Sequence, residues 1–371
     1  MLLDSKLHTW GSREDLHLLL SKALMAQGAK ALLVFSEVAS EELRERYRAH
    51  GVEVTAINYG LGARHYYREL GRLVREHSVT TVHIAFFTYF SLLPWMARLH
   101  GVRWIVYHER NPGVLKAKTW EQLLLRVRTR VVAWPMTRVI MISDYVRRRL
   151  IQAGIPASKS TVVLHGIDTV QYRPDSTARE RVAAEFGIQP GEIILTALSY
   201  LLPHKNIDVI LRACKRLEER GVKVRCFVVG HGPAEARLQA LSQELGLAGR
   251  VHWLGHIPNP VPLLQASDLF LMVSTGEGFG LAVAEAMACG AVPIAARSGA
   301  LPEIVEDGVS GLLVPERDAV ALADSIQMLI QDEGRRRLFA ANGIDRVRRL
   351  FTAEGSTAGV GRVYESMWAG F

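Results

Sequence analysis

Cysteine is scarce in this sequence, and no part of it has the character of a membrane span or of an export signal. The three cysteines, Cys214, Cys226 and Cys289, are too few and too irregularly spaced for a disulfide framework or a thiolate metal site. No stretch of about 18 uninterrupted apolar residues occurs, as a transmembrane helix would require. Residues 1–10 lack the charged start and apolar run of a signal peptide. We therefore expect a cytoplasmic protein that is neither exported nor inserted into a bilayer.

Patterns typical of metal sites and of nucleic-acid readers are missing as well. There is no Asp-x-Asp pair at the end of an expected strand, and no cluster of His, Glu and Asp has ligand spacing, so we expect no metal ion and no other cofactor. The formal charge of +8 suits anionic partners such as phosphorylated substrates or lipid headgroups. Without an aromatic-rich RNA motif or a helix-turn-helix pattern, we expect no nucleic-acid partner.

What the sequence does contain is enough chain for two domains. A length of 371 residues, with 49% apolar and 22% charged residues, is typical of globular proteins and favours two cores. The periodicity breaks at Arg173–Ser176, between two apolar blocks. We expect a first domain over 1–174, a second over 175–350, and a final helix within 351–371 that packs back on the first domain.

Short apolar runs alternate with stretches of helical period in both halves, a pattern that predicts βαβ units and parallel sheets. In the first half we expect strands at 30–35, 80–86, 103–107 and 138–142, and helices at 15–27 and 41–50. In the second half the pattern is clearer, with strands at 193–198, 225–229, 251–254, 269–273 and 292–295. The helices there are expected at 208–220, 234–245, 261–266, 281–289 and 319–332. The fold class is therefore α/β, with two Rossmann-like doubly wound domains.

A glycine-rich loop with two carboxylates follows one of these strands. The strand ends at Val273, the loop contains Glu277, and Glu285 falls in the second turn of the next helix. Ligands of open parallel sheets bind at such strand ends, where free N–H groups and a helix N-terminus attract phosphate. A carboxylate only accepts hydrogen bonds, so it suits the hydroxyls of a sugar.

The two glutamates, with Gly278-Phe279-Gly280 between them, resemble the paired-glutamate motif of the retaining glycosyltransferases of family four, which have the GT-B fold. The resemblance implies that Glu285 holds the ribose hydroxyls of a nucleotide sugar and that Glu277 faces the donor sugar. The alternative is that Glu285 only caps or solvates its helix. The resemblance extends from 162 to about 318 through further segments in the family's order: His165–Asp168, Val228–Pro233, Ser298–Val305 and Asp307–Pro315. On this basis the donor site includes Gly230, Gly232, Gly278, Phe279, Gly280, Leu281 and Glu285.

Lys205 opens a helix after the first strand of the second half, where an ammonium could neutralise a diphosphate without a metal ion. The family pattern has an arginine five residues earlier, and this sequence has Tyr200 there. Ser199 likewise replaces the usual glycine. The departure removes one guanidinium from the phosphate site, so that His204 or another basic group compensates or donor binding is unusual. The alternative for Lys205 is an ordinary surface lysine.

The first half is less informative. Trp10-Gly11-Ser12 precedes the first helix and resembles the glycine loop that closes over the donor phosphate, although Ser12 serves equally well as a plain helix cap. His108 follows a buried-looking strand and resembles a histidine of the family that donates to, or orients, the reacting sugar. A lone histidine there is otherwise a satisfied polar residue. Ser143 matches a family serine, and it is equally well placed to cap the helix that follows.

A basic stretch interleaved with apolar residues runs from Lys116 to Arg138. Such a segment is able to lie on an anionic membrane and bring an enzyme to a lipid-linked acceptor. The alternative is a solvated amphipathic helix packed on the first sheet.

The sequence therefore predicts a GT-B enzyme with its two domains facing across a cleft, in which His108, Lys205 and Glu277 act on a nucleotide sugar. The acceptor is a glycan, a lipid-linked molecule or a small molecule, in the synthesis of cell-surface polysaccharide or glycolipid. Retention of anomeric configuration and the absence of a side-chain nucleophile are implied by the resemblance. A non-catalytic nucleotide-sugar-binding scaffold of the same fold is the alternative that the missing arginine favours.

Overall fold

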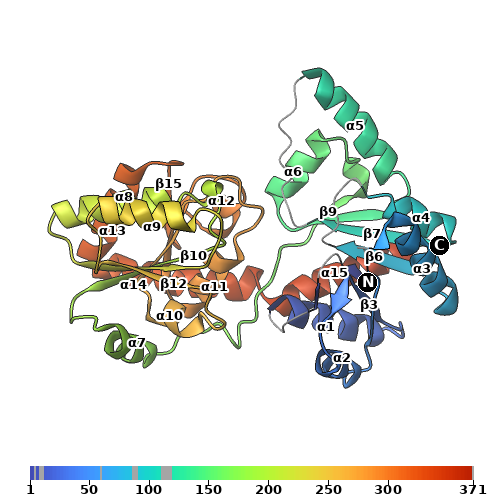
Figure 1. The fold of residues 1–371 in the computed structure, drawn as a ribbon, viewed down its shortest axis with the longest axis horizontal. Coiled ribbons are helices and arrows are strands. Elements are labelled where there is room, and N and C mark those ends of the chain that lie inside the picture. The colour runs from blue at the N-terminus through green and yellow to red at the C-terminus, as the bar shows by residue number, and fades with distance from the viewer. Residues whose placement is uncertain (4–5, 8–11, 59–60, 86–90, 110–118, 370–371) are drawn as a thin grey trace. The chain divides into compact units, whose positions relative to one another are not determined.

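The computed structural model describes residues 1–3, 6–7, 12–58, 61–85, 91–109 and 119–369. The chain divides into two compact units: unit 1 is Met1–Gly166 with Ala353–Phe371, and unit 2 is Ile167–Thr352. Each unit is a parallel sheet with helices on both faces (Figure 1). The expected α/β fold of two doubly wound domains is confirmed.

The first division lies between Gly166 and Ile167, before the boundary expected at residue 174. The intervening residues are held by unit 2, because the amide of Ile167 donates to the carbonyl of Phe351 at 2.9 Å and Tyr172 is buried. Local periodicity breaks at Arg173–Ser176, but these long-range contacts place the division earlier.

Unit 1 has a seven-stranded sheet in the order β5-β3-β1-β6-β7-β8-β9 and a separate parallel pair of β2 and β4. The sheet strands are β1 (Leu2–Leu3), β3 (Leu32–Phe35), β5 (Glu53–Ala56), β6 (Thr81–Ala85), β7 (Trp104–Glu109), β8 (Arg138–Met141) and β9 (Ser160–Val162), and the pair is β2 (Lys6–Leu7) with β4 (Glu37–Val38). The helices are α1 (Ser12–Met25), α2 (Glu41–Arg48), α3 (Ala63–Glu76), α4 (Leu93–Leu99), α5 (Thr119–Ala133), α6 (Asp144–Gln152) and α15 (Ala353–Trp368), with a short 3₁₀ turn, η2 (Ala157–Lys159).

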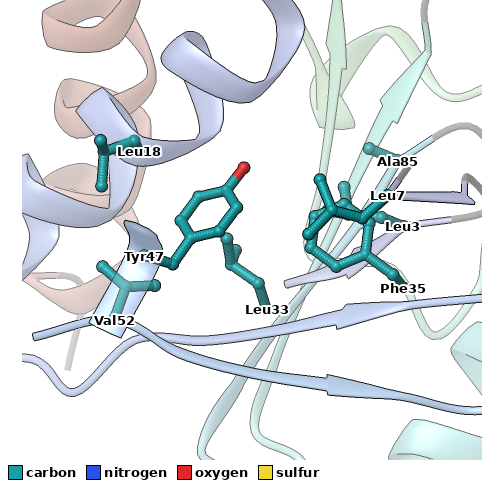
Figure 2. Close-up of a cluster of buried hydrophobic side chains, with 8 residues drawn as sticks. All are labelled: Leu3, Leu7, Leu18, Leu33, Phe35, Tyr47, Val52 and Ala85. Atoms are coloured by element: carbon teal, nitrogen blue, oxygen red, sulfur yellow. The ribbon is translucent and has the colours of Figure 1, made fainter. Parts of the chain in front are cut away.

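One apolar cluster of unit 1 lies where the first strands meet α1 and α2. Figure 2 shows its eight side chains: Leu3, Leu7, Leu18, Leu33, Phe35, Tyr47, Val52 and Ala85. The ring of Tyr47 packs near Phe35 while its hydroxyl donates to the carbonyl of Glu14, so the one polar atom of this large side chain is satisfied. Strands as short as β1 give no periodic signal in the sequence, and this cluster is what holds them.

The final helix α15 belongs to unit 1 and packs against α1. It runs from Ala353 to Trp368, inside the range 351–371 expected for it, and it contains three glycines. One of them permits close packing, because a Cβ at Gly359 would lie 2.7 Å from a methyl group of Val163. Glycine weakens an isolated helix, so the helix forms here because of the surface it covers.

Unit 2 has a six-stranded sheet in the order β12-β11-β10-β13-β14-β15. Its strands are β10 (Ile193–Leu198), β11 (Val224–Val229), β12 (Val251–Gly255), β13 (Leu269–Met272), β14 (Val292–Ala296) and β15 (Leu312–Val314). Its helices are α7 (Ala178–Phe186), α8 (Ile207–Glu219), α9 (Glu235–Glu244), α10 (Val261–Ala266), α11 (Leu281–Cys289), α12 (Leu301–Ile304), α13 (Ala319–Gln331) and α14 (Glu333–Leu350), with a 3₁₀ turn, η3 (Pro203–Lys205). The central strands β10, β13 and β14 are buried on both faces, which is why they read as continuous apolar runs.

Candidate functional site

The strand order of unit 2 reverses between β10 and β13, so the crossovers after these two adjacent strands depart to opposite faces of the sheet. In doubly wound sheets, ligands bind in the crevice that this reversal opens at the carboxyl ends of the strands. The turn η3 follows β10, and the loop at 274–280 follows β13. Topology therefore brings Lys205 and the first predicted glutamate to one edge of the sheet.

Asn206 joins these two segments. It is buried and has a positive φ of 53°, which asparagine tolerates better than most residues. Its Nδ2 donates to the carbonyl of Val273 at 2.8 Å and to Oγ1 of Thr275 at 3.0 Å. In return, the amide of Thr275 donates to the carbonyl of His204 at 2.8 Å. The backbone around Lys205 is thus fixed against the backbone of the glutamate loop.

Lys205 and Glu277 form an ion pair, with Nζ 2.7 Å from Oε2. The two side chains are only 14% and 19% exposed, so Lys205 is not the solvated surface lysine of the alternative interpretation. The loop is held from behind by Gly299, where a Cβ would lie 2.4 Å from the carbonyl oxygen of Glu277, and by Ala300, whose amide donates to that oxygen. An ammonium and a carboxylate are therefore held in place at the reversal point.

Glu285 lies on α11, one helix turn beyond the loop, and is buried. Burial raises the pKa of this carboxyl from 4.5 to about 7, and a hydrogen bond with the side chain of Tyr172 opposes the rise. A buried carboxyl without a full counter-charge is costly to ionise, which disagrees with a merely capping or solvated role. Glu285 can accept hydrogen bonds from the hydroxyl groups of a ligand that binds at this buried position.

The raised pKa predicts that Glu285→Gln stabilises the folded protein at alkaline pH. A carboxyl whose pKa is higher in the folded state favours folding below pH 4.5 and loses that contribution as pH rises through about 7. The advantage of the glutamine variant should grow across this window to about 3 kcal/mol at most. Urea unfolding at a series of pH values measures it, with the exposed Glu244→Gln as the matched control. Parallel stability curves for wild type and Glu285→Gln would contradict the assignment.

The residues between the two glutamates shape the start of α11. Phe279 is buried and meets the ring of Phe351 edge to face, with centroids 5.7 Å apart. Gly280 has a φ of 114°, and a Cβ there would lie 2.8 Å from a methyl group of Leu301. Gly278 precedes this anchor and Leu281 opens the helix. The sequence therefore needs glycine at 280 to turn from the loop into a helix that starts at the sheet edge.

The glycines after β11 are explained by close backbone packing. A Cβ at Gly230 would lie 1.9 Å from the carbonyl oxygen of Ser199, and one at Gly232 would lie 2.6 Å from that of Leu201. The amide of Leu201 donates to the carbonyl of His231 at 2.8 Å, which extends the contact between the two chain segments beyond the strands. Their predicted role in donor binding is thus accompanied by a structural role at the same edge.

Tyr200, which replaces the family's arginine, is exposed and meets the ring of His231 edge to face at 5.3 Å. His231 meets the ring of His256 in the same way at 5.8 Å. These three residues follow β10, β11 and β12, so a row of exposed rings stands where the resemblance leads one to expect a guanidinium. His204, the other basic group considered, is exposed in η3 next to Lys205.

In unit 1, His108 is the penultimate residue of β7 and is buried. Its Nδ1 lies 3.2 Å from Nε2 of His83 on β6, and Nδ1 of His83 lies 2.7 Å from the hydroxyl of Tyr364 on α15. Burial raises the pKa of Tyr364, which keeps the phenol protonated. The sequence placed His108 at a strand end but did not reveal the two side chains behind it.

Two further predictions of unit 1 have different outcomes. Gly11, the proposed donor-loop glycine, lies outside the described residues. Ser143 has a cap role, because its Oγ accepts from the amide of Val146 at 3.2 Å at the start of α6.

Sequence reasoning missed Tyr172, Asn206, His83 and Tyr364. His83 is three residues before the end of the strand expected at 80–86, and an alternating pattern could have placed it on one face of that strand. For Asn206, the only indication in the sequence was its position next to Lys205. No local signal connects Tyr364 with His83, since 281 positions separate them.

Within the described parts of the chain, no group of three or more His, Cys, Asp or Glu side chains is arranged to hold a metal ion. None of the described helices combines the length and the apolar character needed to cross a bilayer.

Comparison with known proteins identifies the class that this fold and site define. Residues 17–171 match the family described as Glycosyltransferase Family 4, and residues 178–346 match Glycosyl transferases group 1. The chain belongs to the family 4 glycosyltransferases of the GT-B fold and is an enzyme that transfers a sugar. The alternative of a non-catalytic scaffold is thereby set aside.

Among curated relatives, the chain is 31% identical over 274 residues to a GDP-mannose-dependent alpha-(1-6)-phosphatidylinositol monomannoside mannosyltransferase of Mycolicibacterium smegmatis, covering 71% of this chain and 70% of that one. It is 36% identical over 201 residues to a D-inositol 3-phosphate glycosyltransferase of Nocardia farcinica, covering 51% and 44%.

Two solved structures share the fold over nearly the whole chain. Anabaena HepE in complex with UDP and glucose has a TM-score of 0.80 at 22% identity, covering 98% of this chain and 99% of that one. Sucrose-phosphate synthase of Thermosynechococcus elongatus has a TM-score of 0.80 at 21% identity, covering 99% and 96%.

Proposed function

We propose that this enzyme transfers a sugar from a nucleotide-sugar donor bound by unit 2 to a glycan, lipid-linked or small-molecule acceptor, with retention of anomeric configuration and without a metal ion. The observation that carries the proposal is the Lys205–Glu277 ion pair at the reversal point of the sheet, followed on α11 by the buried Glu285. A cation, two carboxylates and a helix N-terminus supply the groups that a sugar diphosphate requires.

In the proposed complex, Lys205 contacts the diphosphate. Glu277 accepts a hydrogen bond from a hydroxyl of the donor sugar in place of part of its interaction with Lys205. Glu285 accepts hydrogen bonds from the ribose hydroxyls. His108 of unit 1 donates to the reacting sugar. The donor site is completed by the backbone of Gly230, Gly232, Gly278, Phe279, Gly280 and Leu281. Gly11 is included only because of the family resemblance.

The proposed reaction is the one that the family resemblance implies. The bond between the anomeric carbon and the departing phosphate oxygen breaks, and the acceptor oxygen bonds to that carbon from the same face. The acceptor proton passes to the departing phosphate, so no side-chain nucleophile is needed. Lys205, the loop N–H groups and the N-terminal end of α11 stabilise the negative charge that develops on the diphosphate. This electrostatic stabilisation does not require a metal ion.

The name of one relative supports a role in glycolipid synthesis, and the name of another supports a small-molecule acceptor. One is named for GDP-mannose and a phosphatidylinositol mannoside, another for inositol phosphate, and the fold is shared with a protein solved with UDP and glucose. A lipid-linked acceptor would bring the enzyme to a membrane surface, and peripheral contact with an anionic membrane is part of this proposal.

The test is incubation of the full chain with UDP-, GDP- and ADP-sugars in EDTA, with nucleotide release as the readout. One donor should be turned over slowly in the absence of acceptor, and that donor should also raise the melting temperature, because a ligand that binds the folded state stabilises it. Turnover should disappear in Glu285→Ala. Tight binding of a donor without turnover, even when acceptor extracts are added, would contradict the proposal, as would turnover that EDTA abolishes.

A further inference from the structure

The outer face of α5 exposes an apolar stripe. Six large side chains on this helix and immediately after it are between 53% and 66% exposed: Trp120, Leu123, Leu124, Val127, Val131 and Trp134. At 100° per residue they fall within one face of the helix about 100° wide. The helix therefore has its broad apolar stripe in solvent, although such a stripe normally faces a core.

The opposite face of α5 holds the helix on unit 1. Thr129, Val132 and Ala133 are buried, and a Cβ at Gly154, after α6, would lie 2.6 Å from the backbone carbonyl of Arg126. The indole of Trp95 on α4 stacks on Trp134 at 5.3 Å and donates to the carbonyl of Val131 at 2.9 Å. The stripe is thus presented by a packed helix, and a slight rotation of the helix would not bury it.

Arginines border the stripe on both sides. By helical position, Arg126 and Arg130 flank one edge and Arg128 the other, and all three are exposed. No acidic residue occurs from Gln122 to Trp134. Apolar side chains between flanking cations match the layers of an anionic bilayer surface, where tryptophan and arginine lie at headgroup depth.

We propose that this outer face of α5 is a docking surface for an anionic lipid bilayer. A second copy of the chain fits less well, because a symmetric contact through the same stripe would bring the flanking arginines of both copies together. Docking at this surface would place the enzyme beside a lipid-linked acceptor. The biological purpose of docking therefore rests on the proposed function. Of the two sequence interpretations the docking proposal favours the first, because the six side chains of the stripe face outward while Val132 and Ala133 pack on unit 1.

The test is co-sedimentation of the full chain with vesicles, without donor or acceptor. The protein should bind vesicles made of equal parts phosphatidylcholine and phosphatidylglycerol, bind weakly to pure phosphatidylcholine, and be released by salt. The double substitution Leu124→Ser with Val127→Ser should weaken partitioning about tenfold or more, and Arg126→Gln with Arg130→Gln should remove the preference for phosphatidylglycerol. Leu338→Ser, an exposed apolar position on α14, is the matched control and should bind like wild type.

Several outcomes would overturn the docking proposal. They are equal binding to both vesicle types, no binding to either, or binding that the double substitution leaves unchanged. A dimer that the same substitution dissociates in sedimentation velocity would assign the stripe to a second copy instead. Donor turnover in solution is measured separately, so failure of the docking surface would leave the proposed chemistry untouched.

A second inference comes from the hydrogen-bonded chain behind His108. Among the described residues, His83 is the one hydrogen-bond partner of the Tyr364 hydroxyl, which is buried and protonated. A buried O–H with one partner donates to it. Nδ1 of His83 is then an acceptor, so its Nε2 carries the proton and donates to Nδ1 of His108. Because Nδ1 of His108 accepts this hydrogen bond, the ring proton of His108 lies on Nε2.

We infer that Tyr364 and His83 are positioning residues, which keep His108 as an Nε2–H donor for the sugar. Tyr364→Phe retains the ring but removes the proton that orients the chain. The ¹⁵N shifts of labelled histidines, assigned with His83→Gln and His108→Gln, should show His108 as the Nε2–H tautomer in wild type and as a mixture in Tyr364→Phe. Turnover number should fall about tenfold in the variant, with a smaller change in KM.

Val360→Ala, which loosens the packing of the same helix without touching the hydroxyl, should leave the tautomer unchanged. An unchanged tautomer in Tyr364→Phe would overturn this inference. A changed tautomer with full turnover would keep the hydrogen-bonded chain and contradict the proposed role of His108.

Discussion

Lys205→Met is expected to lower the turnover number about 100- to 1,000-fold, the effect of removing one fixed charge from the place where negative charge develops in a transition state. The methionine retains most of the side-chain volume and loses the ammonium. Because Tyr200 stands where the family has an arginine, Lys205 is the main cation of the proposed phosphate site, and the loss should be large. Steady-state nucleotide release from the active donor measures it.

The same substitution leaves Glu277 largely buried without its partner, so an inactive variant could simply be unstable. Lys205→Met with Glu277→Gln removes both charges and should recover the melting temperature without recovering activity. Lys215→Met, which breaks the 3.0 Å pair with Glu218 on the same helix, is the matched control and should stay active. Near-normal turnover in Lys205→Met would contradict the proposed charge stabilisation.

Glu285→Gln is expected to weaken donor binding and turnover together, lowering kcat/KM about 100-fold or more. The carboxylate can accept hydrogen bonds from two hydroxyl groups through its two oxygens, whereas the amide has one accepting oxygen and an NH₂ group that only donates. Hydrogen bonds to a charged group are also stronger than those to a neutral one. The variant is the same one that should gain stability at alkaline pH. A more stable and less active protein separates the function of this residue from its contribution to the fold.

Isothermal titration with the free nucleoside diphosphate measures the binding part of this loss, because this ligand contains the ribose but lacks the sugar that is transferred. Glu277→Gln should keep most of the affinity for that ligand and lose turnover, since Glu277 is proposed to contact the donor sugar and not the nucleotide. Equal affinity of wild type and Glu285→Gln for the nucleotide would be inconsistent with ribose recognition by Glu285.

Much of unit 2 could be read from the sequence. The bounds of β10, α10 and α11 agree with the expected ranges, and the other elements expected there differ by about one residue at an end. The strands β10, β13 and β14 are buried on both faces, so each is a continuous apolar run, and glycines follow soon after β11, β13 and β14. In unit 1 the short strand β1 and the edge strands β5 and β9 were missed, because their residues are too few or too exposed to form a pattern.

The sequence by itself determined the α/β class, the family and the chemical character of the site, because apolar runs, glycine turns and paired glutamates are local features. The tertiary structure alone decided which groups meet. Lys205 and Glu277 are 72 positions apart and become an ion pair only because the strand order reverses between β10 and β13. Likewise, the sequence left two interpretations of the basic segment open, and packing on unit 1 decided that the apolar stripe of α5 faces outward. Contacts between distant segments depend on topology, which no short stretch of sequence encodes.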